Sequence, residues 1–152
     1  MMKTKNKIQL VIILALMALW LPISIDKLIN FTLFKSAMVQ QPFADSLGRL
    51  LAYTLPLIEF ATGILFVFPK WRLLAFRSSI AMMLIFTGYV ALALLKVWED
   101  IPCGCGLVFN QLGWVAHLWL NLIFLIISIV GCILEKNIRS LQIPLKSEPA
   151  IK

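Results

Sequence analysis

Long apolar runs, separated by short polar connections, follow one another along the chain. A helix needs about 20 mostly apolar residues to cross the hydrocarbon core of a bilayer, and four of the runs are long enough. They cover approximately residues 8–29, 47–68, 76–98 and 114–134. The pattern predicts an all-α integral membrane protein, a bundle of four transmembrane helices that forms one domain over residues 1–152.

The connections and the small residues refine this expectation. In the first connection, Phe31, Phe34 and Met38 fall at helical spacing between polar residues, a pattern typical of a short helix lying in the membrane interface. Residues 135–152 mix charged residues with prolines and are expected to form a frayed cytoplasmic tail. Small residues within the runs are expected to let the helices approach closely; they include Gly63, Ala81, Gly88 and Ala91.

Composition agrees with a membrane protein. The chain is 61% hydrophobic and 14% charged, with a mean hydropathy of +0.94, whereas soluble domains are about 45–50% apolar and about 25% charged. The net charge of +7 does not indicate nucleic-acid binding, because the basic residues lie in short clusters between the apolar runs. The bilayer is therefore the expected surroundings of most of the chain.

Basic residues collect at alternate connections. Short cytoplasmic loops of membrane proteins are enriched in lysine and arginine, so both termini and the connection between the second and third runs are expected in the cytoplasm. The clusters are Lys3, Lys5 and Lys7, then Lys70, Arg72 and Arg77, then Lys136, Arg139 and Lys146. Residues 30–46 and 98–114 are then expected on the opposite side, the periplasm of a bacterium with this protein in its inner membrane.

The segment WEDIPCGCGLVFNQLGWVAH, residues 98–117, contains Cys103 and Cys105. The glycine between them lets the backbone turn tightly. A disulfide between residues i and i+2 closes a small ring, is strained and is easily reduced, and so short a loop stabilises a fold little. Thiol–disulfide exchange is the favoured interpretation. Binding of a soft metal such as Cu(I) or Zn(II) and two unpaired interfacial cysteines are the alternatives.

His117 lies about a dozen residues after the thiols, and Trp114, His117 and Asn121 share one helical face. A histidine in this place can shuttle protons, activate a thiol, or complete a metal site with Cys103 and Cys105. The alternative is a histidine that bonds the backbone of the loop. Asn121 is expected to bond a neighbouring helix.

Glu59 lies about a dozen residues into the second run, near the middle of the membrane. A carboxyl group at that depth is costly and is by default a functional candidate. The functional interpretation is a proton path or contact with a quinone headgroup, close to the distortion expected at Pro56. The structural alternative is a hydrogen bond to Tyr53, Thr87 or Tyr89.

Three further polar or reactive residues are interpreted as structural. Asp26 and Lys27, at the outer end of the first run, are expected to form a local or interhelical polar contact of small energy. Cys132 is separated from the other thiols by most of the bilayer and is expected to be a packing residue.

Two stretches resemble the MauE/DoxX-like redox-associated membrane proteins, the group that includes the methylamine-utilisation protein MauE. One is QPFADSLGRLLAYTLPLIEFATG, and the other is the thiol segment IPCGCG followed by LGWVAH. The resemblance covers roughly residues 10–134. It implies a four-helix inner-membrane protein that takes part in disulfide or electron transfer, together with a thioredoxin-like partner.

An inner-membrane redox accessory protein is the function these observations favour. Cys103 and Cys105 would exchange a disulfide with a periplasmic thioredoxin-like or disulfide-containing protein, His117 would assist proton transfer, and Glu59 would contact a quinone or a proton path. The alternatives are a soft-metal protein with Cys103, Cys105 and His117 as ligands, and a non-catalytic membrane subunit. Hydrolytic and nucleotide-dependent functions are disfavoured, because the chain has no phosphate-binding glycine loop, H-E-x-x-H or G-x-S-x-G motif. The oligomeric state and catalytic turnover by the chain alone stay open.

Overall fold

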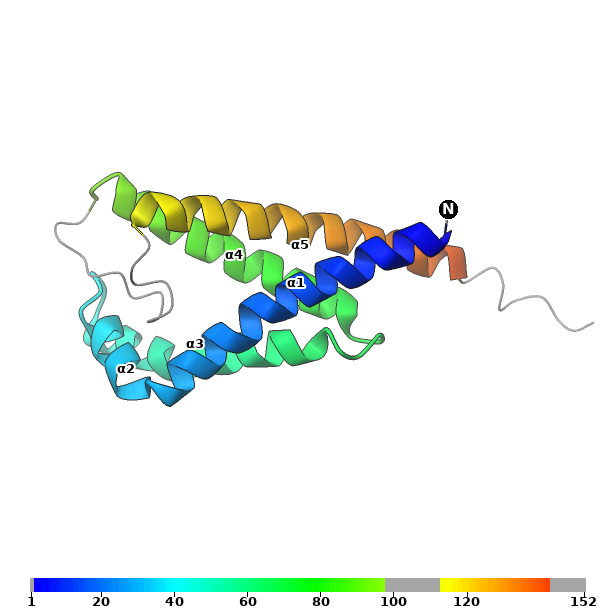
Figure 1. The fold of residues 1–152 in the computed structure, drawn as a ribbon. Coiled ribbons are helices and arrows are strands. Elements are labelled where there is room, and N and C mark those ends of the chain that lie inside the picture. Colours follow the sequence, from blue (N-terminus) through cyan, green and yellow to red (C-terminus); the bar gives the residue numbers. More distant parts are fainter. Residues whose placement is uncertain (1, 98–112, 143–152) are drawn as a thin grey trace, which may run out of the picture.

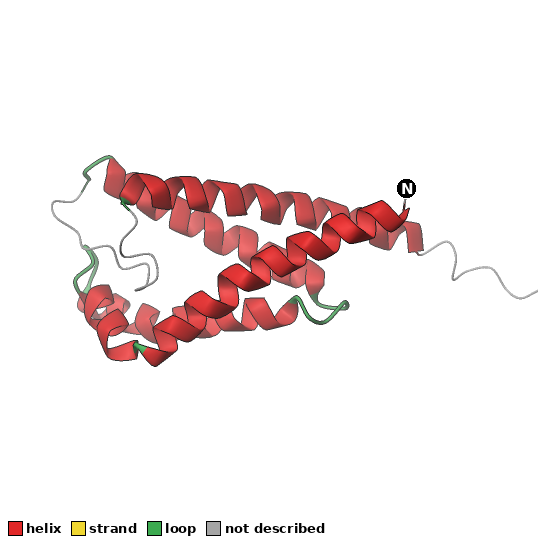
Figure 2. Ribbon diagram, viewed as in Figure 1, coloured by secondary structure: helices red, strands yellow, loops and turns green. Residues whose placement is uncertain are grey.

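The computed structural model describes residues 2–97 and 113–142, and the chain is helical throughout this part apart from short turns (Figures 1 and 2). The helices are α1 (Met2–Ile29), α2 (Phe31–Val39), α3 (Asp45–Leu65), α4 (Arg72–Leu94) and α5 (Trp114–Gln142). The predicted all-α fold is confirmed. Helices long and apolar enough to cross a membrane cover Thr4–Ile29, Arg72–Leu94 and Trp114–Leu141.

α3 covers most of the second expected membrane span. Its 21 residues extend for about 30 Å at about 1.5 Å per residue, which is close to the thickness of the hydrocarbon core. It contains the charged residues Asp45, Arg49 and Glu59, and it is not among the helices that qualify by length and composition. A bundle of four membrane spans therefore stays a prediction that depends on α3.

The first connection contains a helix, α2, at the expected place. Phe34 and Met38 are buried against Ala52 of α3, and the ring centroid of Phe31 lies 4.9 Å from that of Tyr53. The apolar side of α2 thus packs on α3. Its position relative to a membrane surface stays a prediction.

α4 begins and ends earlier than the third apolar run. It starts at Arg72 rather than near residue 76, and it ends at Leu94 rather than near residue 98. The end follows from the backbone of Lys96, which has a φ of 52°. A residue in this left-handed conformation commonly terminates a helix.

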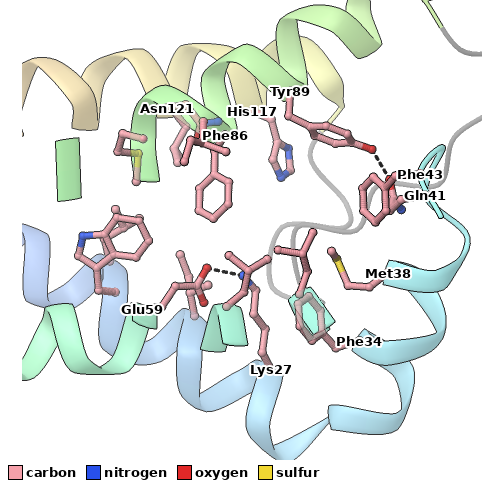
Figure 3. A pocket seen from close by; sticks show the side chains of 18 residues that line it. Lys27, Phe34, Met38, Gln41, Phe43, Glu59, Phe86, Tyr89, His117 and Asn121 are labelled. Carbon is pink, nitrogen blue, oxygen red and sulfur yellow. Dashed lines mark hydrogen bonds and ion pairs between the residues drawn. The ribbon is translucent and has the colours of Figure 1, made fainter. Parts of the chain in front are cut away.

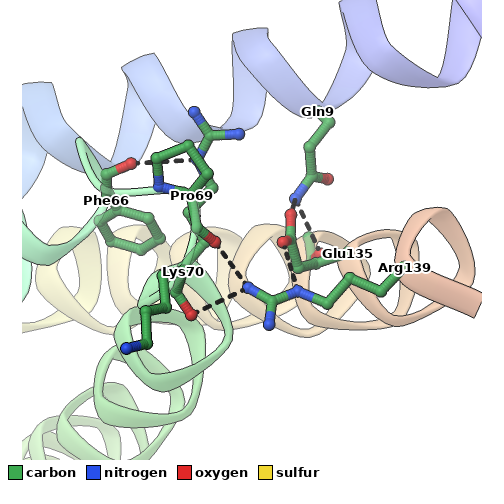
Figure 4. A network of polar contacts seen from close by, with 8 residues as sticks. Gln9, Phe66, Pro69, Lys70, Glu135 and Arg139 are labelled. Atoms are coloured by element: carbon green, nitrogen blue, oxygen red, sulfur yellow. Dashed lines mark hydrogen bonds and ion pairs between the residues drawn. The ribbon is translucent and has the colours of Figure 1, made fainter. Parts of the chain in front are cut away.

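A polar network joins α1 and α5 to the connection between α3 and α4 (Figure 4). Arg139 donates to Glu135 Oε1 at 2.8 Å and to two carbonyl oxygens of that connection at 2.7 and 3.2 Å. Gln9 Nε2 donates to Glu135 Oε2 at 3.0 Å. These contacts hold the last turns of α5, which continues as a helix to Gln142 where the sequence predicts a frayed tail from about residue 135.

The network also places the basic regions of the chain relative to one another. One end of the molecule holds the start of α1, the connection between α3 and α4, and the end of α5 (Figure 1). The opposite end holds α2, the last residues of α4 and the first residues of α5. The expected topology requires this grouping of connections. The compartment that each end faces stays a prediction.

The main core lies between α1, α4 and α5, with Phe66 at the end of α3. The indole Nε1 of Trp20 donates to Ser79 Oγ at 3.0 Å, and Ser79 Oγ lies 2.9 Å from Ser128 Oγ. Hydrogen bonds of this kind between helices add to the packing of membrane proteins. The chain of hydrogen bonds through Trp20, Ser79 and Ser128 therefore links α1, α4 and α5.

Two glycines allow close contact between helices. A Cβ atom at Gly63 would lie 2.6 Å from Leu21 Cδ2, and one at Gly131 would lie 2.8 Å from Ile12 Cγ2. The close approach predicted at Gly63 is confirmed. The same prediction is wrong for Gly88 within the part of the chain that the structure describes, because a Cβ there would meet no described atom within 4 Å.

We expect Gly131→Ala to lower the free energy of unfolding by about 1–3 kcal/mol, because the added methyl group would overpack the contact with Ile12 and Phe76. Gly88→Ala is the matched control. Its added methyl group would meet no described atom within 4 Å, so we expect its effect to be limited to the gain in helix propensity, at most about 1 kcal/mol. Unfolding in detergent, followed by far-UV circular dichroism, measures both. Equal stability of the two variants would contradict the assigned contact.

Candidate functional site

A cavity of about 270 Å³ lies between α1, α2 and α3 on one side and α4 and α5 on the other (Figure 3). Its lining is mostly apolar and aromatic, and every one of these helices contributes side chains. Apolar walls with a few placed polar groups are typical of sites that bind small molecules. The polar side chains in the lining are Lys27, Gln41, Glu59, Tyr89, His117 and Asn121.

Lys27 and Glu59 form a buried ion pair in this lining. Lys27 Nζ donates to Glu59 Oε1 at 2.6 Å, and the two side chains are 5% and 0% exposed. The ammonium group also lies 5.1 Å from the ring centroid of Phe34 and 5.7 Å from that of Phe86, close enough for favourable cation–π contacts. The pair thus joins α1 to α3 and faces aromatic rings of α2 and α4.

One carboxylate oxygen of this pair has no hydrogen-bond partner among residues 2–97 and 113–142. Glu59 Oε2 is buried and accepts no hydrogen bond from the described residues. Desolvation of a buried ion pair is offset only when further hydrogen bonds satisfy the remaining atoms. A ligand that donates a hydrogen bond to Glu59 Oε2 would supply such a bond.

The contact that Lys27 makes with Glu59 is not the weak contact of small energy that the sequence predicted for Lys27. It is interhelical, as the sequence allows, but the burial of both side chains removes it from the class of weak, exposed pairs. The structural alternative for Glu59 is wrong in its partners. Thr87 donates to a carbonyl of its own helix, Tyr89 donates to Gln41, and Tyr53 receives a bond from Lys35.

His117 and Asn121 of α5 line the same cavity, as Figure 3 shows. They are 3% and 7% exposed, and the ring of Trp114, one turn before His117, lies 6.4 Å from that of Tyr89 between centroids. The predicted common face of Trp114, His117 and Asn121 is therefore directed inward. Two predicted site residues far apart in the chain, His117 and Glu59, belong to one cavity.

The two thiols, Cys103 and Cys105, lie outside the described residues. The described chain ends at Val97 after α4 and resumes at Gly113 before α5, at the end of the molecule where α2 lies (Figure 1). His117 lies in the first turn of α5. The thiol segment is therefore attached to the helices beside the cavity.

Two further predictions concern sulfur and metals. Cys132 is a buried, free thiol in the core, as expected for a packing residue. Within residues 2–97 and 113–142, no group of three His, Cys, Asp or Glu side chains is placed to hold a metal ion. The metal set proposed from the sequence, with Cys103, Cys105 and His117, includes two residues beyond that range.

Sequence reasoning identified Glu59 and His117 but missed Lys27 as part of the site. The available signal was the depth of a charged residue in an apolar run, since charges in membrane helices usually pair with one another. Which carboxylate pairs with Lys27 depends on the packing of α1 against α3.

A comparison with family models identifies the family of this chain. The model of the methylamine utilisation protein MauE matches residues 5–134, which include every residue that lines the cavity. No curated protein and no solved structure matches the chain. The match confirms the resemblance inferred from the sequence motifs, and the helices that can cross a membrane agree with it. The chain belongs to the MauE family of membrane proteins.

Proposed function

We propose that the protein is the membrane component of a thiol–disulfide system. Cys103 and Cys105 exchange a disulfide with a periplasmic thioredoxin-like or disulfide-containing partner. The protein crosses a bacterial inner membrane four times, with α3 as the second span and both termini in the cytoplasm. The thiol segment then faces the periplasm, where disulfides persist.

One observation carries the proposal. A cavity that contains a buried ion pair and a buried histidine lies next to the points where the thiol segment joins α4 and α5. Thiol exchange needs proton transfer close to the sulfur atoms, and histidine is the side chain best suited to it near neutral pH. His117, at the start of α5, is the residue we assign to this role.

The exchange proceeds through a mixed disulfide. A thiolate of the partner attacks one sulfur atom of the Cys103–Cys105 disulfide, and the other cysteine leaves as a thiolate. The second thiol of the partner then attacks the mixed disulfide. The partner thereby gains a disulfide, and Cys103 and Cys105 return to the dithiol form.

Thiol trapping in intact cells tests the proposal. We expect a membrane-impermeant maleimide to label Cys103 and Cys105 only after mild reduction, because they form a disulfide on the outer side. Mass analysis of the protein counts the labels. Cys132 is the internal control, since its buried thiol should stay unlabelled in both treatments, and Cys103→Ser/Cys105→Ser should take no label.

Other outcomes separate the alternatives. Labelling without reduction would indicate free thiols or a labile metal, and the metal content of the purified protein, compared with that of the double serine variant, then distinguishes these two. No labelling after reduction would contradict the proposed orientation. An unchanged redox state of all periplasmic disulfide proteins in cells that carry the double serine variant would overturn the exchange function.

A further inference from the structure

We propose that the cavity binds the headgroup of a lipid-soluble quinone, with Lys27 and Glu59 as its polar contacts. Its redox role rests on the function proposed above, whereas the binding site consists only of described residues and is tested without the thiols. In the oxidised form, a carbonyl oxygen of the ring accepts a hydrogen bond from Lys27 Nζ. In the reduced form, a hydroxyl group of the ring donates to Glu59 Oε2.

The route into the cavity indicates a ligand from the lipid phase. Ile85 of α4 belongs to the lining and is 68% exposed, so the cavity reaches the outer surface of a helix that can cross the membrane. Most other lining residues are apolar. A ligand with an apolar body can enter here directly from the bilayer, and an isoprenoid tail can remain outside past Ile85.

Aromatic side chains favour a planar ring inside the cavity. Trp20, Phe34, Phe43, Phe86 and Tyr89 all contribute to the lining. Aromatic rings pack favourably face-offset or edge-to-face on one another. The volume of about 270 Å³ lies just below the range of about 300–1,000 Å³ typical of ligand pockets, which suits a ring headgroup rather than a whole lipid.

The ion pair supplies a donor and an acceptor side by side. A lysine ammonium group has three N–H donors, and Glu59 Oε1 accepts from one of them, while Glu59 Oε2 accepts none from the described residues. A quinone presents acceptors and its hydroquinone presents donors, so both redox forms find a partner. An acyl chain offers neither. A metal cation in the same place would be repelled by Lys27, which disfavours the soft-metal alternative for this cavity.

The redox step balances with the quinone as the oxidant. The thiols of Cys103 and Cys105 lose two electrons and two protons, and a sulfur–sulfur bond forms between them. The two carbonyl oxygens of the quinone each gain one proton, the ring gains the two electrons, and a hydroquinone results. This step regenerates the disulfide that the exchange with the partner consumes.

A binding measurement tests the site separately from the thiol chemistry. The Cys103→Ser/Cys105→Ser protein is purified in detergent and titrated with decylubiquinone, and quenching of tryptophan fluorescence is followed. We expect saturable quenching, most of which is lost in Trp20→Phe because Trp20 lines the cavity. The titration is repeated with the reduced form, decylubiquinol, whose hydroxyl group donates to Glu59. Glu59→Gln should raise the dissociation constant of decylubiquinol about tenfold or more, since bonds to charged groups are worth about 1.5–3 kcal/mol.

Two more variants keep the test decisive. Glu135→Gln removes a buried carboxylate in the polar network at the opposite end of the molecule, and it should leave the dissociation constant within about a factor of two. Ile85→Trp places a larger side chain at the mouth of the cavity without changing the ion pair, and it should abolish binding. This variant tests whether the quinone binds in the cavity even if Glu59→Gln does not fold.

Any one of three results would overturn the proposal. They are no saturable quenching, equal affinity in Ile85→Trp, and displacement of decylubiquinone by phytol, an isoprenoid alcohol without a ring, at concentrations similar to the dissociation constant of decylubiquinone. The last result would indicate a pocket for an apolar chain. Saturable binding with failed thiol trapping would leave the quinone site standing and remove the proposed function. Failed binding with successful trapping would remove only this inference.

Discussion

Lys27→Met is expected to lower the free energy of unfolding by about 3–5 kcal/mol, the usual effect of removing one partner of a buried ion pair. The Glu59 side chain is fully buried and its described polar partner is Lys27. Without the ammonium group, the carboxylate stays in an apolar environment with no opposite charge. Unfolding of the purified protein in mixed micelles with increasing SDS, followed by circular dichroism, measures the loss.

The double variant distinguishes this cause from a loss of packing. Lys27→Met/Glu59→Met removes both charges, and replacement of a buried ion pair by apolar residues is often neutral or stabilising. We therefore expect it to recover most of the stability that Lys27→Met loses. Lys7→Met, at an exposed position of the same helix, should have an effect below about 1 kcal/mol. A double variant as unstable as Lys27→Met would show that the ion pair is not the cause.

Trp20→Ala is expected to lower the free energy of unfolding by about 3–5 kcal/mol, the range for truncation of a buried tryptophan. Trp20 is 1% exposed in the core between α1, α4 and α5, and its indole donates to Ser79 at 3.0 Å. The substitution leaves a cavity at the meeting point of three helices. The same unfolding assay measures its effect.

Trp119 provides the matched control, because it is a tryptophan of α5 with 63% of its surface exposed. Trp119→Ala should cost less than about 1 kcal/mol, as substitutions away from packed sites do. Trp20→Phe keeps most of the apolar volume, and Ser79 keeps its contact with Ser128, so its cost should lie between the two. Similar losses in Trp20→Ala and Trp119→Ala would contradict the assigned role of Trp20.

The candidate site could be predicted only in part. Glu59 was recognisable because a carboxyl group within an apolar run is costly, and His117 because it lies about a dozen residues after the two thiols. That the two residues line one cavity depends on how α3 packs relative to α5. The sequence of neither helix by itself shows how close the two helices lie to each other. Lys27 was placed correctly at the end of its run, but its burial comes from α2 and α3 folding over it.

The glycines illustrate the same limit. Gly63 and Gly88 look equivalent in the sequence, as small residues within apolar runs. A side chain at Gly63 would clash with Leu21 of α1, whereas a Cβ at Gly88 would meet no described atom within 4 Å. Gly131, which no motif distinguishes, lies against Ile12 and Phe76. The side of a helix that meets its neighbours decides which small residue matters.

Helix content and membrane character are properties of the sequence by itself, because they depend on the local length and apolarity of each run. The short helix between the first two long runs is equally local, since it follows from the spacing of Phe31, Phe34 and Met38. The cavity, the Lys27–Glu59 pair and the extension of α5 to Gln142 were decided only by the tertiary structure. Each depends on contacts between residues distant in the chain, and their energies arise only when the helices are packed.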